Sequence, residues 1–211
     1  MSNRFQEIYE RNEWSYGSGE GSLEVQTQGY RAFLKDFMSQ KRIRSVVDMG
    51  CGDWQFSKLI DWSGIDYHGF DVAAVVISDN IKQFASDNVS FSHYSGNADE
   101  LPAADLLIVK DVLMHLPNQV VSDFLPNLNK YKYALITNCT NPIDGALVNK
   151  DIETGDFRYL DLRRPPFDLK AELVYTFDKV ETDWKSKLRR IYRGFPGWRK
   201  LVLLVDNSRG F

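Results

Sequence analysis

The chain has 211 residues, 43% of them hydrophobic, which is enough for one substantial core and fits a single α/β domain spanning residues 1–211. Its net charge of −3 excludes a strongly basic protein, so a nucleic-acid or acidic-membrane partner would need a local patch. The two cysteines, Cys51 and Cys139, fit no CxxC or Cys/His spacing, which argues against a disulfide framework and a structural zinc site.

The N-terminal residues, MSNRFQEIYERNEW, are polar and mixed in charge, and no apolar run approaches the ~20 residues that a membrane span needs. We therefore expect a soluble, cytoplasmic protein with no membrane partner. The glycine-rich segment 12–22 carries Trp14 and Tyr16. We interpret it as a lid that orders over a ligand, and a frayed terminus is the alternative.

Short apolar or β-branched runs alternate with amphipathic ones along the chain, which is typical of βαβ units and a largely parallel sheet. A helix is expected over 22–40, because its large apolar residues recur at helical spacing. Strands are expected over 45–49, 66–71, 89–94, 105–110 and 133–137. Helices are expected over 56–62, 72–86 and 118–131, the last kinked or ended by Pro126. Two more strands, 171–177 and 200–205, show no clear helix pattern between them, which predicts an antiparallel pair.

Residues 139–170 do not fit this alternation. They are rich in turn-forming Asn, Asp, Gly and Pro and are too long for an ordinary connection. Long loops of this kind usually serve as lids or binding loops. We expect an insertion on the substrate side of the domain.

A glycine-rich turn follows the first expected strand, in the segment VVDMGCGDWQ. A strand that ends in Asp48, followed by Gly50 and Gly52, can turn tightly and offer bare main chain to a ligand. Dinucleotide sites need a third glycine where this chain has Gln55, and no P-loop Gly-Lys-Ser/Thr follows. The carboxylate of Asp53 would repel a phosphate and attract a ligand that carries an amino group and a sulfonium.

This turn and two later segments resemble the class I S-adenosylmethionine-dependent methyltransferases. VVDMGCGDWQ is similar to the family's first motif, an acidic residue followed by glycines at alternate positions. YHGFDVA ends a second strand in Asp71, where the family's acidic residue bonds the ribose hydroxyls, and Val72 follows to pack on adenine. YSGNADELPAADLLIVKDVLMHLP is similar to the family's third-strand loop and fourth strand. The tail GDFRYLDLRRPPFDL also looks like segments of sugar-tailoring members.

The resemblance implies a Rossmann-like methyltransferase fold, with a mostly parallel seven-stranded sheet, helices on both faces and an antiparallel C-terminal strand. It also implies S-adenosylmethionine as the cofactor. The cofactor-binding positions that it implies are Asp48, Gly50, Cys51, Gly52, Trp54, Asp71, Val72, Asn97 and Ala98.

Two of these positions depart from the family pattern. Trp54 replaces the third glycine of the first motif, and its indole either forms a wall of the pocket or packs under the turn. Asn97 stands where the family often has an aspartate that contacts the adenine amino group. An amide oxygen can accept the same hydrogen bond without charge assistance.

Methyl transfer to a hydroxyl needs an acceptor held in line and usually a base. His115 follows the fourth strand near the expected acceptor mouth, and a histidine can take a proton at neutral pH. A structural bond to a backbone carbonyl is the alternative role. Lys110 and Asp111 lie at the carboxyl edge, where ligands bind in open α/β sheets. Lys110 would contact the methionine carboxylate, and Asp111 would orient the acceptor or hold His115. Pairing of Lys110 with Asp111 at the surface is the alternative.

Other polar residues carry weaker signals. His68 and His93 lie within expected strands and are interpreted as structural. Asp111, Asn138 and Asn141 have oxygen atoms that suit magnesium, but their spacing is generic, and we expect no metal site.

The basic stretch 184–200 is either a receiver for an anionic acceptor or a solvated face, and the acidity of the whole chain favours the latter. Together with Arg163 and Arg164 it raises the hypothesis of a phosphate-bearing or nucleotide-linked sugar as substrate. The sequence predicts transfer of a methyl group to a small polar acceptor, such as a sugar hydroxyl. The alternatives are methylation of RNA or protein and a noncatalytic S-adenosylmethionine-binding module.

Overall fold

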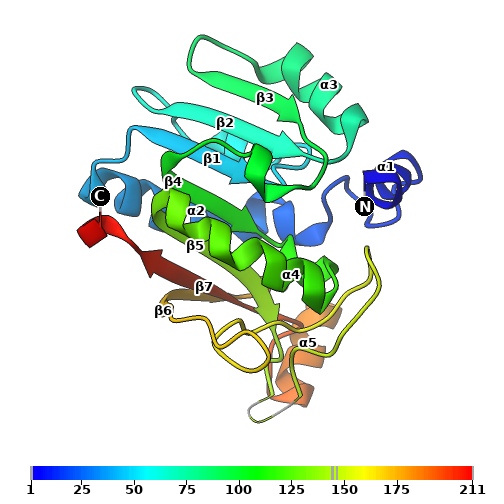
Figure 1. Cartoon of the computed structure of the whole chain (residues 1–211). Helices are drawn as coiled ribbons and strands as arrows, with labels where there is room; N and C mark the ends of the chain where they lie inside the picture. The colour runs from blue at the N-terminus through cyan, green and yellow to red at the C-terminus, as the bar shows by residue number, and fades with distance from the viewer. Residues whose placement is uncertain (1, 144, 146, 211) are drawn as a thin grey trace.

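A seven-stranded sheet forms the centre of the computed structural model, which describes residues 2–143, 145 and 147–210 (Figure 1). The strand order is β3-β2-β1-β4-β5-β7-β6, and β7 runs in the direction opposite to that of the other six strands. This arrangement confirms the predicted fold class. The strands are β1 (Ser45–Met49), β2 (Asp66–Asp71), β3 (Val89–His93), β4 (Ala104–Lys110), β5 (Tyr131–Thr140), β6 (Glu172–Asp178) and β7 (Arg199–Asp206).

The two faces of the sheet carry separate apolar cores, because successive side chains of a strand point to opposite faces. Val46, Leu106 and Ile108 face helices α2 (Glu24–Lys41) and α3 (Ala74–Phe84), while Leu107 and Val109 face α1 (Ser2–Glu10) and α4 (Asn118–Phe124). The central strands are therefore covered on both sides, which explains their continuous apolar runs. Within the described residues, no helix has the length and apolar character of a membrane span.

Three expected helices differ from the structure. Residues 56–62 form only a 3-10 turn, Ser57–Leu59, because a segment this short cannot sustain a helix and Trp62 folds back to donate from Nε1 to the Ser57 carbonyl at 2.9 Å. Helix α4 ends at Phe124 rather than at 131, and Pro126 lies in the 3-10 helix Leu125–Lys130 that follows. Helix α3 is shorter than the expected 72–86.

The C-terminal pair β6 and β7 is antiparallel, as predicted. The expectation that no helix separates them was wrong, because α5 (Trp184–Arg193) lies between the two strands. Asp183 caps its first turn by accepting from the Ser186 amide, and Gly194 ends it in the left-handed conformation. This helix has no buried residue, so its apolar side chains form no core-facing stripe by which a core helix is recognised.

Candidate active site

The glycine-rich turn lies at the carboxyl edge of β1 and is held against the end of β2. The amides of Gly50 and Cys51 both donate to the Phe70 carbonyl, at 2.7 and 3.0 Å. Gly50 has φ 75°, and a Cβ there would lie 2.3 Å from Val112. Only glycine satisfies both conditions, so the turn approaches the loop after β4 with bare main chain.

Asp71 joins the turn to the start of α3. One carboxylate oxygen accepts from the Gly52 amide at 3.0 Å and the other from the Ala73 amide at 2.9 Å. Burial raises the pKa of this carboxyl, and the backbone donors oppose that rise. Each oxygen keeps a second lone pair for a ligand hydroxyl.

Asp48 lies beneath the turn and is not among the residues that line the cavity above it. It is 1% exposed and accepts from the Tyr67 hydroxyl at 2.6 Å. Burial raises its pKa to about 6. The end of β1 is thus fixed to β2 by a buried hydrogen bond.

Trp54 also lies beneath the turn. Its backbone is left-handed, with φ 57°, and its indole packs among Tyr67, Phe84 and Phe91 with ring centroids 5.1 to 5.6 Å apart. Nε1 of Trp54 is buried without a hydrogen-bond partner. Of the two roles considered for this indole, the structure favours packing under the turn, because Trp54 does not line the cavity above it.

A cavity opens above the turn, at the carboxyl edge of the sheet. Phe5, Tyr9, Phe56 and Tyr94 contribute to its wall, none of which the sequence reasoning singled out. Phe5 and Tyr9 project from α1 at helical spacing, which is the signal that was available for them. The cavity brings together these predicted site residues: Gly50, Cys51, Gly52, Asp71, Val72, Lys110, Asp111 and His115.

Asn97 and Ala98 line a neighbouring cavity instead, which shares Tyr94 and Leu116 with the first. The side-chain oxygen of Asn97 accepts from the Asp99 amide at 3.0 Å and caps the short 3-10 helix Ala98–Glu100. The side-chain amide of Asn97 is therefore engaged in a local helix cap at the rim of the site.

His115 lies on the 3-10 turn Leu113–His115 after β4, with its ring between Trp14 and Phe157. Its Nδ1 is 2.8 Å from the carbonyl oxygen of Asp156. A carbonyl only accepts hydrogen bonds, so Nδ1 carries the proton and Nε2 keeps its lone pair. Burial lowers the pKa of His115, which favours this neutral form. Asp111 does not hold this ring; the Asp156 carbonyl does.

An O-methyltransferase domain family matches residues 2–137, more than half of the chain. The chain belongs to this family. It is therefore a class I S-adenosylmethionine-dependent methyltransferase, as the sequence motifs implied, and its cofactor is S-adenosylmethionine.

Solved methyltransferase structures share the fold at low sequence identity. The 1,6-didemethyltoxoflavin-N1-methyltransferase of Burkholderia thailandensis has a TM-score of 0.64 at 13% identity, with 97% of this chain and 87% of that chain covered. The magnesium protoporphyrin IX methyltransferase of Synechocystis PCC 6803, solved with bound SAH, has a TM-score of 0.60 at 16% identity, with 97% and 99% covered. No curated protein matches the sequence.

The N-terminal segment 12–22 of the methyltransferase lies across the turn. Ser18 donates from Oγ to the Asp53 carboxylate at 2.6 Å and accepts from the Asp53 amide at 3.0 Å. Trp14 and Ser22 line the cavity, whereas Tyr16 is 63% exposed and does not. The carboxylate of Asp53, expected to attract a ligand amino group, lines the cavity and is also bonded to this segment.

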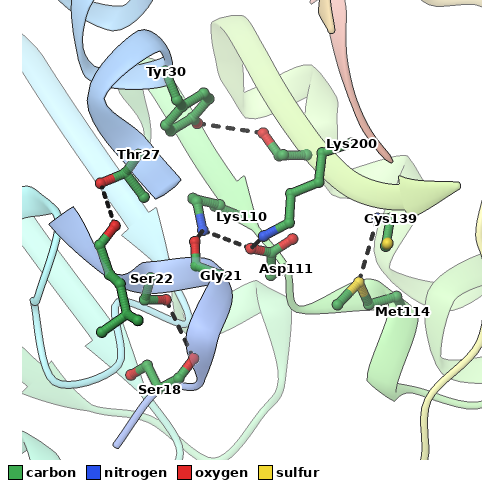
Figure 2. A network of polar contacts seen from close by, with 12 residues as sticks. Ser18, Gly21, Ser22, Thr27, Tyr30, Lys110, Asp111, Met114, Cys139 and Lys200 are labelled. Carbon is green, nitrogen blue, oxygen red and sulfur yellow. Dashed lines mark hydrogen bonds and ion pairs between the residues drawn. The ribbon is translucent and has the colours of Figure 1, made fainter. Parts of the chain in front are cut away.

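Lys110, Asp111 and Lys200 form a buried charge cluster beside the cavity (Figure 2). Nζ of Lys110 lies 2.5 Å from Asp111 Oδ2 and also donates to the Gly21 carbonyl at 3.2 Å. Lys200 pairs with the same carboxylate oxygen. Asp111 Oδ1 is buried without a partner. The sequence indicated Lys200 only as the last residue of the basic stretch 184–200, and nothing in its strand predicted its contact with Asp111.

The cluster holds two ammonium groups against one carboxylate. Burial, together with the charge of Lys200, lowers the pKa of Lys110 to about 8 against the opposing effect of Asp111. Burial would raise the pKa of Asp111, but the two lysines hold it at about 2. This part of the site is therefore electropositive next to the cavity.

Residues 141–171 contain no strand or helix among those that the structure describes, and they support the His115 loop. Gly155 and Arg158 donate from their amides to the carbonyls of His115 and Met114, at 2.9 and 3.2 Å. The buried Arg158 guanidinium donates to the Leu116 carbonyl at 2.6 Å. The predicted insertion therefore fixes the position of the loop after β4.

The remaining polar candidates lie elsewhere. His68 bonds Ser92 between β2 and β3 at 2.8 Å, and His93 is exposed on β3. Arg163 pairs with Asp161 at 2.9 Å beside a separate cavity. Within the described part of the chain, no group of three His, Cys, Asp or Glu side chains is placed to hold a metal ion.

Proposed function

We propose that this methyltransferase transfers the methyl group of S-adenosylmethionine to a hydroxyl of a small polar metabolite, with a sugar or a related compound as the acceptor class. The observation that carries the proposal is His115. It lines the same cavity as the glycine-rich turn, its Nδ1 is engaged by the Asp156 carbonyl, and burial keeps the ring neutral. Such a ring offers Nε2 as a general base for a hydroxyl.

The glycine-rich turn and Asp71 hold the cofactor in this proposal. The main chain of Gly50, Cys51 and Gly52 contacts its methionine end, and Asp71 accepts hydrogen bonds from the ribose hydroxyls while Val72 packs on the adenine. Asp48 and Trp54 act from beneath by fixing the turn. Asn97 and Ala98 border the adenine from the neighbouring cavity.

Lys110 meets the methionine carboxylate in the proposed complex. Its ammonium group lies near the negative charge of Asp111 and the positive charge of Lys200, and it also donates to the Gly21 carbonyl. A second carboxylate would balance the cluster. The unpartnered Oδ1 of Asp111 can then accept a hydrogen bond from the acceptor.

Methyl transfer to a hydroxyl requires the protein to align the acceptor with the methyl donor and to take one proton from the acceptor. The bound cofactor supplies a methyl carbon on a positively charged sulfur. Asp111 would orient the acceptor hydroxyl, and Nε2 of His115 would take its proton, while the cofactor, when bound, would supply the methyl group. The closed N-terminal segment keeps water away from this cavity.

Calorimetry with S-adenosylmethionine and with S-adenosylhomocysteine tests the cofactor part of the proposal. Binding heat with both is expected, and its absence with both would refute the site.

A mass-spectrometric screen with labelled methyl donor tests the acceptor, using panels of sugars, nucleotide-linked sugars, amines and RNA. Label on a sugar oxygen supports the proposal, and label confined to nitrogen or to RNA contradicts it.

The substitution Asp71→Ala is expected to weaken S-adenosylhomocysteine binding by about 1.5 to 3 kcal/mol, because charge-assisted hydrogen bonds to the ribose are lost. This corresponds to a rise in Kd of about ten- to 150-fold, measured by calorimetry. Asp66→Ala, at the exposed opposite end of β2, is the matched control and should leave Kd unchanged. Equal Kd values for the two variants would remove Asp71 from the cofactor site.

A further inference from the structure

Helix α5 presents an apolar stripe to solvent. The helix has no buried residue, and Trp184, Leu188, Ile191 and Tyr192 are 67%, 54%, 77% and 94% exposed. At ~3.6 residues per turn these four positions fall within an arc of about 100° on one side of the helix. Packing against the sheet therefore does not explain why four large apolar side chains recur at this spacing.

The rest of the helix surface is cationic. Its ten residues include five basic side chains and no acidic one, in a chain whose net charge is −3. Arg190 is tied to the sheet by Asp178 at 3.5 Å. Within the residues that the structure describes, no ion pair engages Lys187, Arg189 or Arg193. Lys185 and Lys187 flank the apolar stripe on its two sides, as the same helical spacing requires.

We propose that α5 docks this methyltransferase onto an anionic lipid surface. A bilayer interface stabilises both the apolar stripe and the cationic side chains of α5. The stripe enters the boundary between headgroups and acyl chains, and the cations contact the lipid phosphates. Trp184 and Tyr192, near the two ends of the stripe, are residue types favoured at headgroup depth. A nucleic acid would engage the cations alone and leave the stripe exposed to water.

The position of α5 ties docking to the site. The helix connects β6 to β7 at the sheet edge where β5 ends, and Arg199 of β7 pairs in register with Thr140 there (Figure 1). Lys200, the next residue of β7, belongs to the charge cluster beside the cavity. A lipid surface under α5 therefore lies along the edge of the sheet that carries the cavity. Docking would provide the local patch that an acidic-membrane partner needs on a chain of net charge −3, and it departs from the expectation of no membrane partner.

Vesicle flotation tests the proposal with the full chain. We expect binding to phosphatidylcholine vesicles that contain about 30% phosphatidylglycerol, and at least roughly tenfold weaker binding to pure phosphatidylcholine. The double variant Leu188→Glu/Ile191→Glu should lose roughly tenfold or more of the partition coefficient, because charged groups replace the centre of the stripe. Ile81→Glu, at a 48% exposed apolar site on α3, is the matched control and should bind as the parent chain does.

The double variant is expected to keep the circular dichroism spectrum and the S-adenosylhomocysteine affinity of the parent chain. These two measurements check that it is folded. The proposal is overturned if the parent chain does not float with the anionic vesicles, or if the double variant floats as well as the parent. It is also overturned if RNA binds the parent and the double variant equally while vesicles bind neither, since α5 would then be a nucleic-acid surface. A blue shift of tryptophan emission with vesicles that disappears in Trp184→Phe would support insertion of the stripe.

Discussion

Replacing His115 by alanine is expected to lower kcat for a hydroxyl acceptor about 10²- to 10⁴-fold, because the acceptor would lose its general base. The affinity for S-adenosylhomocysteine should change little, since the ring is proposed to face the acceptor rather than the cofactor. The measurement is single-turnover methyl transfer together with calorimetry. For the parent enzyme, kcat/KM should rise with pH through the pKa of His115. Burial puts that midpoint below the ordinary 6.5, so the base is lost only on the acidic side.

Two controls separate the base from a supporting role for the same side chain. His115→Asn keeps an amide donor for the Asp156 carbonyl but has no basic nitrogen, so it should be as slow as the alanine variant if His115 is the base. Recovery of activity in His115→Asn would identify a positioning role instead. His93→Ala, at an exposed position of β3, should retain the parent rate and pH profile.

Replacing Trp54 by alanine is expected to lower the free energy of unfolding by about 3 to 5 kcal/mol, because a buried indole among three aromatic rings would leave a large cavity. Urea unfolding followed by circular dichroism measures the loss. Trp184→Ala removes the same side chain from a 67% exposed position and should cost less than about 0.5 kcal/mol.

A second replacement at the same position tests the details of this packing. Trp54→Phe keeps an aromatic ring and removes the buried Nε1 that lacks a partner, so the loss should stay below about 1.5 kcal/mol. If Trp54→Ala cost no more than Trp54→Phe, the indole would not support the turn. A weaker affinity for S-adenosylhomocysteine in Trp54→Ala would further link the packing beneath the turn to the site above it.

The buried strands were predictable because nothing competes with their pattern. Residues 45–49 and 66–71 were predicted with the bounds that the structure has, and β4 differs by one residue. The runs of β1 and β4 are mostly apolar and lie between turn-forming residues, so periodicity, length and propensity all agree there. The antiparallel pairing of β6 and β7 was likewise predicted, because the two runs follow one another at the end of the chain.

The helices that were missed, α1 and α5, take little of their stability from the sheet core. Helix α5 buries none of its residues, so only its caps, Asp183 and Gly194, could have marked its ends. Helix α1 contributes Phe5 and Ile8 to the core from an otherwise polar sequence. Apolar periodicity does not predict either helix, because the apolar residues of α5 face outward and α1 has only two buried ones.

The candidate site was predictable where one strand ends in a recognisable motif. The turn, Asp71 and His115 come from motifs of this kind, and all reach the same cavity. The contributions of Phe5, Ser18 and Lys200 depend on contacts between segments far apart in the sequence, which spacing along the chain cannot show. The position of the Trp54 indole required the coordinates of the aromatic rings around it.

The placement of β7 bears on how the molecule is completed during synthesis. β7 is inserted between β5 and β6, so β6 has no neighbouring strand until the later strand has left the ribosome. Lys200 arrives with that strand, and until then Asp111 has Lys110 as its only partner in the cluster. The catalytic edge of the growing chain therefore acquires its final charge balance only after β7 has been synthesised.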